Sequence, residues 1–164
     1  MDGTLSRGQL IAIIALRVLI GWHFLYEGLS KLTNPGWSAS GYLLQSRGPL
    51  SGLFRWMAAD PSVLSTVNQL NMWGLAAIGL GLILGCFTRL ASAAGLLVIL
   101  LFYLCNPPFV GYFYAIPTEG SYLVVNKNLV EAAALAVVMV TNSGRAAGLD
   151  GLMHGLQRRR GERP

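Results

Sequence analysis

Four apolar segments, each close to the length of a membrane crossing, constrain this chain most. A membrane-spanning helix needs about 20 predominantly apolar residues. The segments cover residues 10–29, 70–87, 90–106 and 122–140. Only 12% of the residues are charged, whereas an ordinary soluble domain carries about 25%. We therefore expect an all-α membrane protein, a bundle of four transmembrane helices that forms a single membrane domain over residues 1–164.

The basic residues predict how this bundle is oriented, because cytoplasmic loops and ends accumulate Lys and Arg. With four spans both termini share one side, and that side holds Arg7, Arg89, Arg145, Arg158, Arg159, Arg160 and Arg163. We expect a multi-pass protein of a bacterial inner membrane, with both termini and the basic tail 141–164 in the cytoplasm. The net charge of +5 suggests anionic lipid rather than nucleic acid, because the basic run adjoins a span and lacks interleaved aromatic residues.

The loop 33–69 on the opposite side is rich in aromatic and apolar residues, so we expect a structured segment. Residues 49–58 predict a short interfacial helix that stops at Asp60. A further helix is expected to start at Asp60-Pro61 and continue into the second span. Thr88 and Arg89 alone link the second and third spans, which predicts a tight antiparallel hairpin. The second outer loop is also aromatic, and we expect both outer loops to form a cap.

Ionisable side chains inside the predicted spans are the main functional signal, since such groups normally face the bundle interior and pair with one another. His23, Glu27 and Lys31 are four residues apart and share one face of a helix. Lys127 and Glu131 enter the fourth span at a similar depth. His23, Glu27 and Glu131 are the candidate catalytic residues, because a histidine beside a carboxylate can hold a proton near neutral pH. The candidate cofactor-binding residues are Arg17, Lys31, Trp73, Tyr103 and Lys127.

Each of these residues also has a structural interpretation. Lys31 and Lys127 could extend towards the membrane surface, and Glu27 could pair with Lys31 on its own helix. Arg17 could be a structural anchor bonded to backbone carbonyls or to a carboxylate. His23 could simply be held by a hydrogen bond.

Several other chemistries are disfavoured by the residue inventory. Cys86 and Cys105 are expected at opposite ends of the bundle, so a disulfide between them within one chain is excluded. The two histidines, His23 and His154, are also expected on opposite sides. We therefore expect no haem and no metal. Phosphate-binding glycine loops and nucleophile elbows are missing from the sequence as well.

Spacing in the first span resembles the first-helix signature of the DoxX family of small four-helix membrane proteins. The pattern is Arg17-x3-Gly21-x2-Phe24-x3-Gly28-x2-Lys31-Leu32. Further similarity lies in Gly85-Cys86-Phe87-Thr88-Arg89, in Asn128-Leu129 and in Gly148-Leu149-Asp150. The resemblance implies a relation to the small membrane subunit of thiosulfate:quinone oxidoreductase. It implies no agreed set of catalytic residues.

Three functional hypotheses follow. The first is a membrane redox subunit that binds a quinone near the outer leaflet and couples it to a partner oxidoreductase. The second is a non-catalytic membrane anchor or assembly factor for a partner protein. The third, a small transporter, would need oligomerisation, because a single four-span chain without an inverted repeat offers no pathway. A partner protein or a homo-oligomer is expected in addition to the lipid bilayer.

Overall fold

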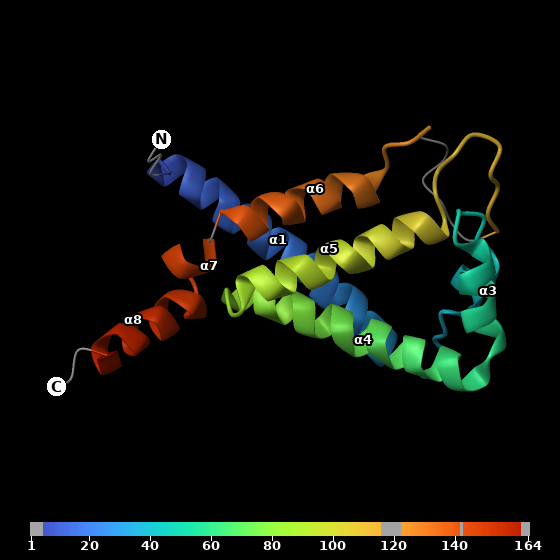
Figure 1. Cartoon of the computed structure of the whole chain (residues 1–164), viewed down its shortest axis with the longest axis horizontal. Coiled ribbons are helices and arrows are strands. Elements are labelled where there is room, and N and C mark those ends of the chain that lie inside the picture. Colours follow the sequence, from blue (N-terminus) through green and yellow to red (C-terminus); the bar gives the residue numbers. More distant parts are fainter. Residues whose placement is uncertain (1–4, 116–122, 142, 162–164) are drawn as a thin grey trace.

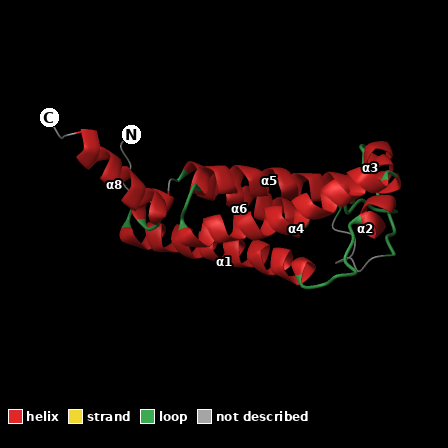
Figure 2. Cartoon of the chain, turned by 90° about the horizontal axis from the view of Figure 1, so that it is seen from below, coloured by secondary structure: helices red, strands yellow, loops and turns green. Residues whose placement is uncertain are grey.

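A computed structural model of the chain describes residues 5–115, 123–141 and 143–161, and within these residues every regular element is a helix. The longest helices are α1 (Arg7–Leu32), α4 (Pro61–Leu84), α5 (Thr88–Cys105) and α6 (Lys127–Val140). The shorter ones are α2 (Ser40–Leu44), α3 (Ser51–Ala59), α7 (Ser143–Ala146) and α8 (Leu149–Gly161). The four longest helices form an elongated bundle (Figure 1). We call the end with α2 and α3 the cap end, and the end with α7 and α8 the terminal end (Figure 2).

Within the residues that the structure describes, three helices, α1, α4 and α5, are long and apolar enough to cross a membrane. The molecule is thus a helical membrane protein. Helix α6 has 14 residues, which gives a rise of about 21 Å against a hydrocarbon core of about 30 Å. The expected fourth span began at Tyr122, which lies outside the described residues, but the helix itself begins only at Lys127. Asn126 caps it, since its side chain accepts a hydrogen bond from the Leu129 N–H at 3.2 Å.

The boundary between α3 and α4 confirms two predictions, the short helix in the loop and the helix start at Asp60-Pro61. The Asp60 carboxylate accepts hydrogen bonds from the backbone N–H groups of Ser62 at 2.9 Å and Val63 at 3.1 Å. Pro61 occupies the first turn, where a missing N–H costs little. Helix α4 is therefore one continuous helix of 24 residues from the cap to the terminal end.

The α4–α5 hairpin is tight, as expected, but its turn lies earlier than the sequence suggested. Helix α4 ends at Gly85, which has the left-handed φ of +62° that glycine adopts at little cost. Thr88 and Arg89, the expected link, already belong to the first turn of α5. The turn is therefore Gly85–Phe87, and it faces the terminal end.

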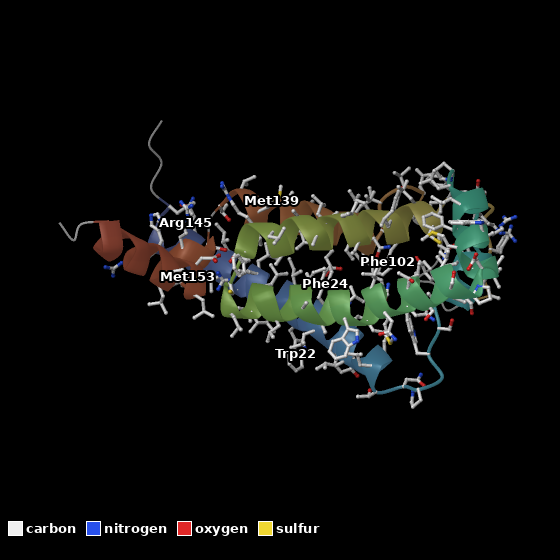
Figure 3. All side chains as sticks on the ribbon, turned by 60° about the horizontal axis from the view of Figure 1, so that its bottom comes forward. Trp22, Phe24, Phe102, Met139, Arg145 and Met153 are labelled. Atoms are coloured by element: carbon white, nitrogen blue, oxygen red, sulfur yellow. The ribbon has the colours of Figure 1, made fainter. Side chains whose placement is uncertain are left out.

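Helices α1 and α4 are in close backbone contact. A Cβ at Gly79 of α4 would overlap the backbone of Leu25, and it would lie 2.5 Å from the carbonyl oxygen of Gly21. Interior side chains fill the rest of the bundle, and Figure 3 shows Phe24 among them. Trp22 instead is 61% exposed on the outside of α1. Such apolar exposure suits a surface that faces lipid.

The two loops at the cap end pack together, which confirms the expected cap. The Ser46 hydroxyl donates to the Cys105 carbonyl at 2.7 Å. The Ala115 N–H donates to the Gln45 side-chain oxygen at 2.6 Å and joins the second loop to the first. Cys105 is buried at this end, whereas Cys86 lies in the α4–α5 turn at the other end. The two thiols therefore lie at opposite ends, as expected.

Candidate functional site

His23 of α1 and Glu131 of α6 form an acid–base pair that joins two helices. The imidazole Nδ1 lies 2.8 Å from the Glu131 Oε1. The Glu131 side chain is only 12% exposed, whereas that of His23 is 47% exposed. The Nδ1–Oε1 distance fits a hydrogen bond between the imidazole and the carboxylate, which fixes the orientation of the imidazole ring. With Nδ1 occupied, Nε2 is the nitrogen left to approach a ligand.

Lys31 and Glu27 form the second acid–base pair, within α1. The Lys31 ammonium lies 3.1 Å from a Glu27 carboxylate oxygen, and the Lys31 side chain is only 13% exposed. Its Nζ lies 5.4 Å from the ring centre of Trp37 and 5.9 Å from that of Phe102. Cation–π attraction therefore holds this ammonium among aromatic rings of the cap and α5. Lys31 does not extend to the surface, although its pairing with Glu27 follows the structural interpretation.

Tyr103 and Lys127 lie next to these pairs. The Tyr103 hydroxyl donates a hydrogen bond of 2.9 Å to the Val124 carbonyl, in the segment that leads into α6. Lys127 begins α6, one turn before Glu131, and is near enough to His23 to interact with it electrostatically. Helices α1, α5 and α6 thus bring together six predicted site residues near the cap. These residues are His23, Glu27, Lys31, Tyr103, Lys127 and Glu131.

Trp73 does not line this site. Its side chain is 62% exposed on α4, whereas Leu75, Ile78, Gly79 and Leu82 are buried there. Each residue turns a helix by about 100°, so Trp73 lies about 200° from Leu75 and faces away from the interior. Two aromatic residues that sequence reasoning missed, Trp37 and Phe102, contact Lys31 instead. The only signal for Trp37 was the high aromatic content of the loop.

Arg17 lies in a different part of the molecule from the other predicted residues. It is buried, and its Nη2 donates a hydrogen bond of 2.7 Å to the Ala147 carbonyl. Its guanidinium also lies beside Gly85, where a Cβ would be 2.9 Å from Nη1. The structure therefore places Arg17 between the α4–α5 turn and the tail, consistent with a structural anchor rather than a cofactor contact.

Asp150, which sequence reasoning named only as part of the Gly148-Leu149-Asp150 motif and gave no role, lies beside Arg17 at the terminal end. Its carboxylate accepts hydrogen bonds from the N–H groups of Phe87 at 2.7 Å and Thr88 at 2.9 Å. Its own N–H donates to the Gly85 carbonyl at 2.9 Å. Burial disfavours the charged carboxylate, but these hydrogen bonds and the charge of Arg17 outweigh it and lower the pKa of Asp150. The motif Gly148-Leu149-Asp150 thus fastens the tail to the start of α5.

These observations define the class of protein: a helical membrane protein with one acid–base pair between two helices and another within a helix, both near one end. A family model described as DoxX matches residues 12–105, which include most of α1 and all of α2 to α5. This is more than half of the 164 residues, and the chain belongs to the DoxX family. No curated protein and no solved structure matches it. Glu131 and Lys127 lie outside the matched region.

Proposed function

We propose that this DoxX protein is the membrane subunit of a redox complex, which binds a quinone near the outer leaflet and couples it to a partner oxidoreductase. The observation that carries the proposal is the His23–Glu131 pair, with its 2.8 Å contact between α1 and α6. Such a pair can hold and release a proton near neutral pH. The half-exposed imidazole also lets a ligand that arrives from the lipid reach it.

A bound quinone would supply a carrier that takes up two electrons and two protons, with the electrons coming from the partner. His23 would hydrogen-bond one carbonyl oxygen through Nε2 and transfer a proton to it, while Glu131 stabilises the imidazolium. Glu27, 46% exposed and paired with Lys31, would take up a proton from the water side and pass it to the second carbonyl oxygen. Tyr103 is positioned by Val124 and would flank the ring.

The proposal includes four membrane crossings, with both termini in the cytoplasm of a bacterium and the protein in the inner membrane. The start of α1 and the helices α7 and α8 lie at one end of the bundle (Figure 1). The arginines of that end favour the cytoplasmic side. For α6 to cross, the bilayer must thin locally or the flanking segments must extend to the interface.

The experiment measures quinone bound to the full-length protein. The protein is purified in native lipid particles and quinones are extracted and quantified. Quinone reduction is followed in membranes that contain the native complex.

His23→Ala and Glu131→Gln are expected to lower quinone occupancy and turnover by about tenfold, as for loss of a proton-transfer group. His154→Ala, an exposed histidine at the terminal end, is the matched control. Unchanged quinone content in both variants would contradict the proposal, and loss of folded protein would favour a structural pair.

A second candidate function, a non-catalytic anchor or assembly factor, is favoured by one observation. Two cavities at the cap end lack His23 and Glu131 among their lining residues. A protein that docks a partner through its cap would need the paired charges only to hold its own helices together. Copurification separates the two functions. A stoichiometric partner without quinone supports the anchor, whereas quinone bound to the lone chain supports the redox subunit.

A further inference from the structure

The cap contains a cavity of about 770 Å³ that the proposed quinone site does not use. It lies between the start of α3, the segment before it and residues 112–115 of the second loop. A neighbouring cavity of about 350 Å³ shares Arg47 and Tyr112 with it and continues towards Tyr103. The larger of these hollows has room for the head group of a lipid or another small molecule.

Two arginines give this cavity a positive charge. Arg55 lies one turn after Ser51 on α3, so both side chains line the same wall. The Arg55 Nη2 donates a hydrogen bond of 2.9 Å to the Ser46 carbonyl, which holds the guanidinium in place. Arg47, in the segment between α2 and α3, also lines the cavity. Among the residues that the structure describes, no carboxylate lies within 4.0 Å of either guanidinium, since the ion pairs found there are those of His23 and Lys31.

This charge arrangement favours a phosphate group as ligand. A guanidinium carries five N–H donors, and two of them can bind two oxygens of one oxyanion. Arg55 keeps donors beyond the one bonded to Ser46, and the Ser51 hydroxyl adds another. Two positive charges in one cavity favour a negatively charged phosphate ester over a neutral ligand.

Exposed apolar side chains line the cavity or lie on the helix beside it, and they indicate which kind of molecule would carry the phosphate. Leu44 is 55% exposed and Phe113 is 81% exposed, and both line the cavity. Leu53 and Trp56 of α3 are also exposed, at 49% and 56%. Exposed leucine and tryptophan beside arginine, at the end of membrane helices, are typical of the interface between head groups and acyl chains.

We propose that this cavity is a binding site for a phosphate ester, with Arg47 and Arg55 as its ligands and Ser51 as a further donor. The same chemistry is offered by an anionic phospholipid and by a small soluble phosphate. The exposed Leu44 and Phe113 favour the phospholipid, whose glycerol and acyl chains would lie along these two side chains. The site is independent of the proposed quinone chemistry.

The test uses the full-length protein in detergent, with native mass spectrometry to count bound molecules at increasing ligand concentration. The probes are phosphatidylglycerol, glycerol 1-phosphate and inorganic phosphate. Phosphatidylglycerol is expected to bind most tightly, and Arg47→Ala with Arg55→Ala is expected to weaken it by about tenfold or more, as for loss of charge-assisted hydrogen bonds. Tight binding of glycerol 1-phosphate with the same arginine dependence would keep the site and assign it to a soluble ligand.

Two further variants test whether a loss of binding comes from the cavity itself rather than from misfolding or from a general loss of positive charge. Arg47→Glu leaves the Arg55–Ser46 bond intact, so the cap should fold, yet the reversed charge should abolish binding. Arg89→Ala, an exposed arginine at the terminal end, should leave binding unchanged. Wild-type affinity of the Arg47→Glu protein for all three probes would overturn the proposal, as would equal losses in the Arg89→Ala protein.

Discussion

One carboxylate, that of Asp150, links the tail to the turn between α4 and α5. It satisfies the N–H groups of Phe87, the residue before α5, and of Thr88, its first residue, because N–H groups at a helix start have no partner within the helix. The negative charge also suits a helix N-terminus. Arg17 contacts the same turn and the Ala147 carbonyl. Asp150 and Arg17 together therefore join three segments that are distant in the sequence: α1, the α4–α5 turn and the tail.

We expect Asp150→Asn to destabilise the protein by about 1 kcal/mol, the usual effect of a weakened helix cap. The N–H groups of Phe87 and Thr88 bond to different oxygens of the carboxylate, and in asparagine one of these positions becomes an NH2 group that cannot accept a hydrogen bond. Unfolding of the purified protein by denaturant in detergent measures the change. An unfolding free energy equal to that of the native protein would show that the tail contributes nothing to the stability of the α5 start.

Ionisation of Asp150 should also make the free energy of unfolding depend on pH. The pKa of Asp150 is lower in the folded protein than its ordinary value. Its stabilising contribution is therefore complete above the ordinary pKa of aspartate, and it is lost as pH falls through the folded value. The difference in unfolding free energy between the native protein and the Asp150→Asn variant should shrink over that acidic range. A difference that stays constant with pH would exclude ionisation of Asp150 as its cause.

Sequence reasoning predicted which ionisable residues gather near the cap and that Glu27 could pair with Lys31, but not that His23 pairs with Glu131. Spacing of four placed His23, Glu27 and Lys31 on one face of α1. Which of them meets Glu131 depends on how α1 and α6 are rotated about their axes, and periodicity within one helix carries no such information. Arg17 shows the same limit, because its partner Ala147 lies 130 residues away.

At the scale of elements, the contact between α1 and α4 depends on small residues. Gly79 lies where the two backbones meet, so any side chain there must push the helices apart. Gly74 lies on the same helix with no atom within 4 Å of an added Cβ. The two positions have the same helix propensity and differ in their surroundings, which makes them a matched pair.

We expect Gly79→Ala to destabilise the protein by about 1–3 kcal/mol, the range for overpacking of a close interface. Gly74→Ala should be neutral or stabilising by up to about 1 kcal/mol, because alanine favours helix more than glycine does. Unfolding of both variants in mixed micelles measures the two changes. Equal effects at the two positions would mean that the close approach of the helices is unimportant for stability.

Most helix boundaries were predictable because their signals are local. Asp60-Pro61 marks the start of α4, and apolar length marks α1 and α5. The start of α6 was placed five residues early, because the apolar residues before Asn126 match the hydropathy of a span. The cap hydrogen bond that Asn126 forms with Leu129 sets the true start. The α4–α5 turn was misplaced because Gly85 takes a left-handed conformation there.

At the scale of the whole molecule, α6 decides the topology. Helices α1, α4 and α5 alternate in direction between the terminal end and the cap, and α6 then returns to the terminal end (Figure 1). If α6 crosses the bilayer, three crossings separate α3 from α7, and the two lie on opposite sides. If α6 remains on one side, only α4 and α5 cross between them, and α3 and α7 share a side.

Cysteine labelling distinguishes these topologies. Ala59→Cys at the end of α3 and Ala146→Cys in α7 replace exposed alanines, in a background of Cys86→Ser and Cys105→Ala. With four crossings and cytoplasmic termini, a membrane-impermeant maleimide added to intact cells should label Ala59→Cys alone. Both should react once the cells are opened. Labelling of both positions in intact cells would place them on one side, so that the 14 residues of α6 do not span the bilayer.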